Sequence, residues 1–203
     1  MTTAKDLFII ALHLGSPDRP VGQGDLSLTL AGAELIDLVS AGAITLDGDR
    51  IVPDRGPAVD DRLLAEAAAT LEGQAPYERV EDWLWRRGRD LAGAYQSALE
   101  EDGVLSQGRR GRFRSGADRV EPADTPARRQ ALERWEGGEP VLAALASAAG
   151  VPGGRQPQDG PSSEDEAVTT VLLTVGDAVM ELEAVRQRRA IENAAFANVW
   201  RGP

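Results

Sequence analysis

The sequence predicts a mainly α-helical fold, a single-domain helical bundle that carries two short β-hairpins. Three observations support this fold class. Apolar residues recur at three- and four-residue spacing along most of the chain, glycines stand where these segments stop, and strand-like alternation is confined to two short stretches. The chain has 203 residues, a length within the range of one domain. We therefore expect residues 1–203 to form a single domain.

The first half of the chain contains four helical patterns. Residues 3–14 are apolar nearly all round, which predicts a buried helix. Residues 26–41 predict a second helix, with Asp25 as its N-cap. Residues 60–73 predict a third helix, and residues 78–102 predict one longer helix that contains two glycines as weak points.

Two segments read as hairpins that directly follow a helix. In the first, Ile44 and Leu46 alternate with polar residues, Asp47-Gly48 supplies a tight turn, and Ile51 begins the return strand. The second begins after Gly103 with the apolar pair Val104-Leu105. The sequence thus uses the same arrangement of helix, glycine and two strands twice.

The second half of the chain is again helical. Thr125-Pro126 predicts an N-cap and first helical residue, and Pro140 starts a further apolar segment. Residues 150–162 are rich in glycine, proline and polar residues, which predicts a mobile loop. Residues 163–203 predict a C-terminal helical region that begins with a capping box.

The composition disfavours an enzyme. The chain has no cysteine and one histidine, His13, and it lacks the serine motif G-x-S-x-G and a phosphate-binding loop with its lysine. We predict neither catalytic residues nor a metal, and no cofactor. The absence of cysteine fits a cytoplasmic protein, and the N-terminal apolar run is too short to span a membrane.

The charge distribution is uneven. The formal net charge is −11, which disfavours bulk attraction to nucleic acid. Residues 109–119 nevertheless contain five arginines, namely Arg109, Arg110, Arg112, Arg114 and Arg119, against one acidic residue, Asp118. Phe113 lies between two of these arginines. They either contact an anionic partner through their forked donors, or they neutralise nearby acids such as Glu100, Glu101 and Asp102.

Three stretches together carry a family resemblance. They are "TTAKDLFIIALHL", "LAGAELIDLVSAGAITLDGDRIVP" and "EDWLWRRGRDLAGAYQSALEEDGVL". In this order they resemble the Golgi phosphoprotein 3 family, including its bacterial members, over residues 3–149. The resemblance implies a helical bundle with a protruding hairpin. It also implies a peripheral membrane protein and not an enzyme, since eukaryotic members bind phosphatidylinositol 4-phosphate and act as adaptors for glycosyltransferases.

The resemblance also implies positions for a head-group pocket. A tryptophan position of the family falls near Gly22, an arginine position falls at Ala31, and an Arg-x-x-Arg pair falls at Arg89 and Ala92. Only Arg89 keeps the family residue, and Arg86, about one helical turn away, could substitute for a missing arginine. The hairpin keeps its place but is rich in arginine.

We therefore expect a non-enzymatic cytoplasmic domain that is peripheral at the inner face of the membrane and binds anionic phospholipid head groups there. The predicted contacts are Arg86, Arg89, Arg109, Arg110, Arg112, Phe113 and Arg114. Two alternatives stay open: an adaptor that binds only a protein client, and a nucleic-acid-binding module of winged-helix type, which the negative charge disfavours.

Overall fold

The computed structural model describes residues 2–15, 21–54, 56, 59–71, 73–107, 120–122, 124–153 and 165–199. Helices dominate these residues, so the predicted mainly α fold is confirmed. The helices are α1 Thr3–Leu14, α2 Gln23–Ser40, α3 Arg62–Ala69, α4 Val80–Arg87, α5 Leu91–Glu101, α6 Pro126–Glu136, α7 Pro140–Ala148 and α8 Glu166–Val199. The strands are β1 Ile44–Asp47, β2 Arg50–Pro53, β3 Leu105–Gln107 and β4 Val120–Pro122, and they form two separate antiparallel pairs.

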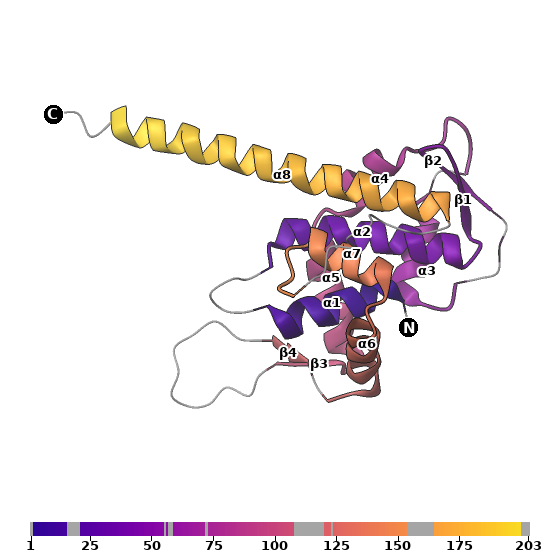
Figure 1. Ribbon diagram of the computed structural model, residues 1–203. Helices are drawn as coiled ribbons and strands as arrows, with labels where there is room; N and C mark the ends of the chain where they lie inside the picture. The colour runs from indigo at the N-terminus through magenta and orange to yellow at the C-terminus, as the bar shows by residue number, and fades with distance from the viewer. Residues whose placement is uncertain are drawn as a thin grey trace.

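Helix α2 lies at the centre of the molecule and is surrounded by other helices (Figure 1). It packs against α1, α3, α4, α5, α7 and α8, and its residues from Leu26 to Ile36 are all buried. Small residues let α8 approach closely. A Cβ atom placed on Gly32 would lie 2.3 Å from a methyl carbon of Val175 on α8. The absence of a side chain at Gly32 therefore lets α2 and α8 pack closely.

Helix α1 is held at its N-terminus by a residue from α2. The carboxylate of Asp37 accepts hydrogen bonds from the backbone N–H groups of Thr3 and Ala4, at 2.9 and 3.1 Å. The local N-cap, Thr2, accepts a further hydrogen bond from the N–H of Lys5. The free N–H donors in the first turn of α1 are thus satisfied by one acidic side chain, Asp37, and one hydroxyl side chain, Thr2. Because Asp37 belongs to α2, its hydrogen bonds hold α1 against α2.

The first hairpin forms as predicted and is joined to the start of α4. Leu46 pairs with Ile51 across β1 and β2, and Gly48 has the positive φ of 60° that a tight turn needs. The N–H of Ile51 donates to the carbonyl of Glu78, and the N–H of Val80 donates to the carbonyl of Asp49, each at 2.9 Å. The hairpin therefore positions the N-terminus of α4.

Two predicted helix boundaries were wrong. The long helix expected over residues 78–102 is divided into α4 and α5 by a turn in which Asp90 adopts a left-handed conformation, with φ of 56°. Asp25 is not an N-cap, because α2 begins at Gln23 after Gly22. Asp25 instead lies in the first turn of α2 and pairs with Arg186 of α8 at 2.7 Å.

The second half of the chain forms the predicted helices. Thr125 caps α6 and Pro126 is its first residue, while α7 begins at Pro140. Most of the predicted loop over residues 150–162, and Ser163 of the capping box, lie outside the described residues. Helix α8 runs along α2 and then extends well past the other helices (Figure 1). Within the described residues, no helix is long and apolar enough to cross a membrane.

Candidate functional site

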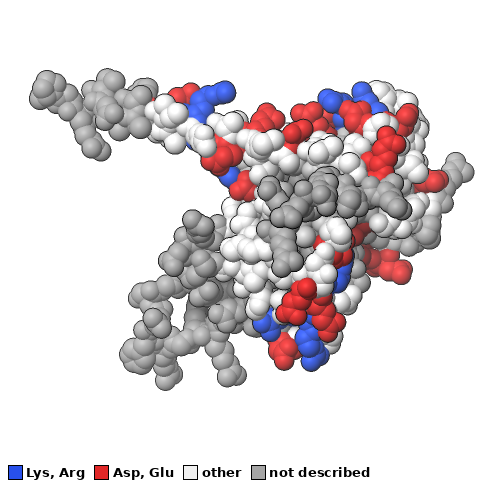
Figure 2. All heavy atoms as spheres, viewed as in Figure 1, with Lys and Arg blue, Asp and Glu red and all other residues white. Residues whose placement is uncertain are grey.

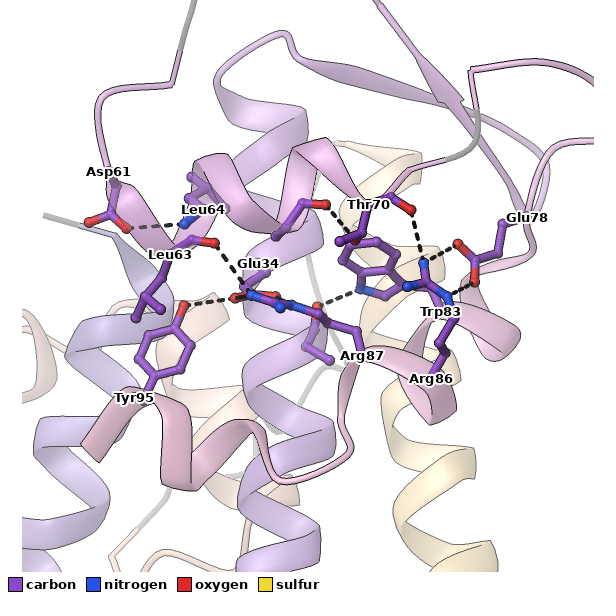
Figure 3. A network of polar contacts seen from close by, with 12 residues as sticks. Glu34, Asp61, Leu63, Leu64, Thr70, Glu78, Trp83, Arg86, Arg87 and Tyr95 are labelled. Carbon is purple, nitrogen blue, oxygen red and sulfur yellow. Dashed lines mark hydrogen bonds and ion pairs between the residues drawn. The ribbon is translucent and has the colours of Figure 1, made fainter. Parts of the chain in front are cut away.

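Three arginines lie close together where α4 ends and α5 begins, and each has different surroundings. Arg87 points into the core, Arg86 lies over the side chain of Trp83 at the surface, and Arg89 is exposed in the turn that follows (Figure 3). Two of the three, Arg86 and Arg89, are the predicted head-group contacts. Their surroundings decide which of them can meet a ligand.

Arg87 forms a buried ion pair with Glu34 at the centre of the molecule. Its Nε and one terminal nitrogen donate to the two carboxylate oxygens of Glu34, each at 2.8 Å, and the hydroxyl of Tyr95 donates to the same carboxylate at 3.2 Å (Figure 3). The Glu34 side chain is 0% exposed and that of Arg87 is 16% exposed. Arg87 also donates to the carbonyl of Leu63. The pair joins α2, α3, α4 and α5 and leaves Arg87 unable to contact a ligand.

The buried groups have shifted pKa values. Burial raises the pKa of Glu34, and the hydrogen bonds and charge of Arg87 oppose this effect. Burial alone would lower the pKa of Arg87, but its hydrogen bonds to Glu34 and the negative charge of that group raise it. Burial and the neighbouring Glu34 carboxylate also raise the pKa of Tyr95 well above its usual value. Tyr95 is therefore a hydrogen-bond donor and not a proton acceptor here.

Arg86 is held by neighbouring groups on the surface. Its Nε and a terminal nitrogen donate to the two carboxylate oxygens of Glu78, each at 2.7 Å, and its guanidinium lies 5.0 Å from the centroid of the Trp83 ring. A terminal nitrogen also reaches the carbonyl of Thr70 at 3.5 Å. An anionic ligand would have to displace Glu78, so this geometry does not favour Arg86 as a head-group contact.

Arg89 has the freest surroundings of the three arginines. Its side chain is exposed, and it forms no ion pair with another residue in the described part of the chain. It precedes Asp90, whose left-handed backbone reverses the chain between α4 and α5. Of the two predicted contacts in this region, the structure leaves Arg89 accessible to an anion.

Two of the other positions of the family pocket are buried, and the third, Gly22, is partly buried. Ala31 is 0% exposed and Ala92 is 2% exposed. The indole N–H of Trp83 donates to the carbonyl of Ala31 at 3.3 Å, so the tryptophan covers this position. Gly22 lies next to Asp25 and Arg186. Within the described residues, these positions form core and helix contacts.

The predicted hairpin contacts Arg109, Arg110, Arg112, Phe113 and Arg114 lie outside the described residues. The base of this hairpin is described: β3 and β4 pair with each other and contact α5 and α1. Figure 1 places this base at the opposite end of the molecule from α4. Helix α5, about 16 Å long at 1.5 Å per residue, separates Arg89 from β3. The base of the hairpin and Arg89 therefore belong to separate surfaces.

Acidic and basic side chains are interleaved on the described surface. Figure 2 shows both kinds around α6 and around the α4 end of the molecule. On α6, Arg134 pairs with the fully buried Asp6 of α1 and, at 3.1 Å, with Glu139. Lys5 pairs with Asp61 at 2.8 Å. Many cations of the described residues are thus neutralised by neighbouring acids.

Sequence reasoning missed the buried ion pair between Glu34 and Arg87. Glu34 stands one helical turn from both Leu30 and Leu38, on an apolar stripe of α2. A carboxylate at such a position indicates a buried cationic partner. Arg87 stands in the same relation to Trp83 and Leu84 of its own helix. The helical spacing of Glu34 and of Arg87 from apolar residues could have identified each as a buried charged residue, although only the fold shows that the two pair with each other.

The described residues offer little for chemistry. No cluster of histidine, aspartate or glutamate among them is arranged to hold a metal ion. A pocket of about 230 Å³ lies near the end of α6, lined by Trp135, Glu136, Gly138, Ala143 and Gly153. It contains a single acidic group and lies on different elements from the three arginines.

Comparison with known proteins identifies the family of this chain. The comparison with curated protein sequences found no match. The sequence model of the Golgi phosphoprotein 3 (GPP34) family matches residues 4–193, which includes α1, the central α2, the arginines of α4 and most of α8. The chain therefore belongs to the Golgi phosphoprotein 3 family.

Proposed function

We propose that this protein is a non-enzymatic, peripheral membrane-binding domain that recognises anionic phospholipid head groups at the inner face of the membrane, and that it can act as an adaptor. The observation that carries the proposal is a basic segment between two anchored strands. Residues 108–119 contain five arginines and one acidic residue in a chain of net charge −11, and both ends of the segment continue into the paired strands β3 and β4.

The energetics favour a loose electrostatic contact. Each basic residue near an anionic membrane surface contributes about 1 kcal/mol, so Arg109, Arg110, Arg112 and Arg114 together could hold the domain on a bilayer. Phe113 adds an apolar side chain that can enter the interfacial region. The family positions at Ala31 and Ala92 are buried and apolar. This supports recognition of anionic lipid in general over a selective phosphatidylinositol 4-phosphate pocket.

The winged-helix alternative lacks a recognition helix. Such a helix must lie in the major groove and offer side chains to base edges. Helix α2, which precedes the first hairpin, is buried along most of its length. Helix α5, which precedes the second hairpin, contains no arginine or lysine and exposes Ala94, Ser97 and Glu101. Neither helix is suited to DNA.

Vesicle co-sedimentation tests the proposal. We expect salt-sensitive binding to vesicles that contain anionic lipid and none to vesicles of neutral lipid. Replacing Arg109, Arg110, Arg112 and Arg114 with serine should abolish the binding and leave the melting temperature nearly unchanged. The control replaces Arg62 and Arg189, which are exposed on α3 and α8, with serine.

The remaining outcomes separate the alternatives. One outcome is selective binding to vesicles doped with phosphatidylinositol 4-phosphate that is lost in Arg89→Ser. This outcome would show a selective head-group pocket, contrary to the expectation from the buried Ala31 and Ala92. Unchanged binding by the four-arginine variant would exclude the hairpin as the contact. An absence of binding to every vesicle would favour an adaptor that binds only a protein client.

A further inference from the structure

The outer face of α8 carries an apolar stripe with no described partner. The large hydrophobic residues that are exposed in the described structure are Leu173, Met180 and Ile191, with exposed fractions of 58%, 66% and 70%. All three belong to α8. Large apolar side chains exposed along one line of a helix are typical of a surface that another helix covers.

The three residues lie on one line along the helix. At 3.6 residues per turn, about two turns separate Leu173 from Met180 and about five turns separate Leu173 from Ile191, so all three project in nearly the same direction. Ala184, also exposed, falls on the same line. Val171, Val175 and Ala178 project to the opposite side and are buried against the rest of the molecule. The stripe therefore faces directly away from the core.

The stripe is symmetric about its centre. Leu182 lies midway in the sequence between Leu173 and Ile191, and also midway between Met180 and Ala184. If a second α8 lies antiparallel on this face, with a two-fold axis at the level of Leu182, then Leu173 meets Ile191 of the second copy. Met180 likewise meets Ala184. A two-fold interface requires such self-complementarity.

The charges beside the stripe fit the same arrangement. Asp177 and Arg188 are both exposed and lie on the same side of the stripe. Within one helix they are about three turns apart and cannot pair. In the antiparallel dimer each Asp177 lies level with Arg188 of the other copy, because Leu182 is almost midway between them. Ion pairs beside an apolar seam set the orientation of paired helices.

We infer that α8 is a homodimerisation helix, and that two copies of this chain pair antiparallel through Leu173, Met180, Ala184 and Ile191. The shape of the molecule permits this pairing. Most of the other helices lie on one side of α8, α4 lies beside its N-terminal half, and the C-terminal part of α8 extends beyond them all (Figure 1). In the dimer the two α8 helices lie side by side at the centre, and the helices that pack on each α8 lie on its far side from the partner. The inference does not depend on lipid binding.

The first test is the oligomeric state of the full chain, measured by sedimentation velocity over a range of concentrations. We expect a monomer–dimer equilibrium whose dissociation constant rises at least about tenfold in Ile191→Glu. Asn193→Glu is the matched control. It adds the same charge at an exposed position on the other side of the helix and should leave the equilibrium unchanged.

Cysteine cross-linking tests the register, and the absence of native cysteine makes it clean. Under oxidising conditions a mixture of Leu173→Cys and Ile191→Cys proteins should form a disulfide-linked dimer, and neither protein should do so alone. Asp177→Arg and Arg188→Asp should each weaken the dimer, and the double variant should restore it.

Three results would overturn the inference. These are a chain that stays monomeric at every concentration, equal behaviour of the Ile191→Glu and Asn193→Glu variants, and cross-linking of Leu173→Cys by itself, which would indicate parallel helices. A monomer whose vesicle binding is lost in Ile191→Glu would assign the stripe to the membrane and would also overturn it.

Discussion

At the scale of single residues, Arg86 and Arg87 show how adjacent arginines acquire opposite roles. Helical geometry turns successive side chains by about 100°, so Arg87 faces the core and Arg86 faces the surface. Arg87 is bound by Glu34, whose side chain is 0% exposed, whereas Arg86 pairs with Glu78 at a surface position that is 43% exposed. The residues "RRGR" by themselves do not show this difference, although the spacing of Arg87 from Trp83 and Leu84 indicates that Arg87 lies on the apolar face of its helix. The difference emerges from the positions of α2 and the hairpin that precedes α4.

Removing Arg87 should therefore be costly, and removing Arg86 should not. Arg87→Met leaves the carboxylate of Glu34 buried without its cation, and we expect a loss of about 3–5 kcal/mol in the free energy of unfolding. Arg86→Met removes a surface pair and should cost less than about 1 kcal/mol. Urea denaturation measures both. Equal losses in the two variants would contradict the structural role of the buried pair.

A second substitution distinguishes loss of the cation from loss of packing. Glu34→Gln added to Arg87→Met removes the uncompensated charge and should recover part of the lost stability. If the double variant is less stable than Arg87→Met, the side-chain volume of Arg87 matters more than its charge.

At the scale of elements, most helices and the first hairpin could be predicted from apolar spacing and turn residues. The boundaries that were missed depend on tertiary contacts. Asp25 has the chemistry of an N-cap but is bound by Arg186 from the far end of the chain. The division between α4 and α5 needs a left-handed backbone at Asp90, a conformation that non-glycine residues adopt infrequently. The pairing of Asp25 is not encoded within its local segment, whereas α4 does end at Gly88, one of the two glycines that the sequence marks as weak points.

The contact between α2 and α8 gives an element-scale prediction. Gly32→Ala would place a Cβ atom 2.3 Å from a methyl carbon of Val175, whose β-branched side chain is stiff. We expect this overpacking to outweigh the gain of about 1 kcal/mol in helix propensity and to lower the stability by roughly 1 kcal/mol. Thermal denaturation measures the change.

Gly176 provides the matched control on α8. A Cβ atom there meets no atom of the described residues within 4 Å, so Gly176→Ala should raise the stability by about 0.5–1 kcal/mol. Val175→Ala added to Gly32→Ala should relieve the clash. A Gly32→Ala protein that is more stable than the parent would show that α8 lies farther from α2 than described here.

At the scale of the whole molecule, the buried carboxyl groups determine how stability depends on pH. Burial raises the pKa values of Asp6, Glu34 and Asp37, with opposition from Arg134, from Arg87 and from the backbone N–H groups of Thr3 and Ala4, respectively. A carboxyl group with a higher pKa when folded binds its proton more tightly in the folded state. Its contribution to stability is complete below the unfolded-state pKa and is lost as the pH rises through the folded-state pKa.

We therefore expect the melting temperature to rise as the pH is lowered from 7 towards about 5. The reduction of the net charge of −11 acts in the same direction, because it weakens repulsion within the molecule. Calorimetry at constant ionic strength measures this. Glu34→Gln should flatten the slope, since it removes one of the three groups. A melting temperature that falls steadily over this range would contradict the assignment.

The predicted lipid contacts also fall into two separate regions of the molecule, one around Arg86 and Arg89 and one at the second hairpin. Arg89 is accessible, Arg86 is held by Glu78, and the base of the second hairpin lies at the opposite end of the molecule from α4 (Figure 1). Sequence spacing cannot show this separation, because α5 joins the two regions through a short run of residues. The contacts assigned to Arg109, Arg110, Arg112, Phe113 and Arg114 stay a prediction, for which the vesicle experiment is the test.

The packing of α8 on α2 also bears on how the protein is made. A ribosome releases α2 well before Val171 and Val175, which cover Gly32. A nascent chain that ends near residue 150 has its central helix uncovered on one face. Completion of the core must wait until α8 has been translated. Messages truncated before α8 should therefore yield chains that depend on chaperones and are removed by proteolysis.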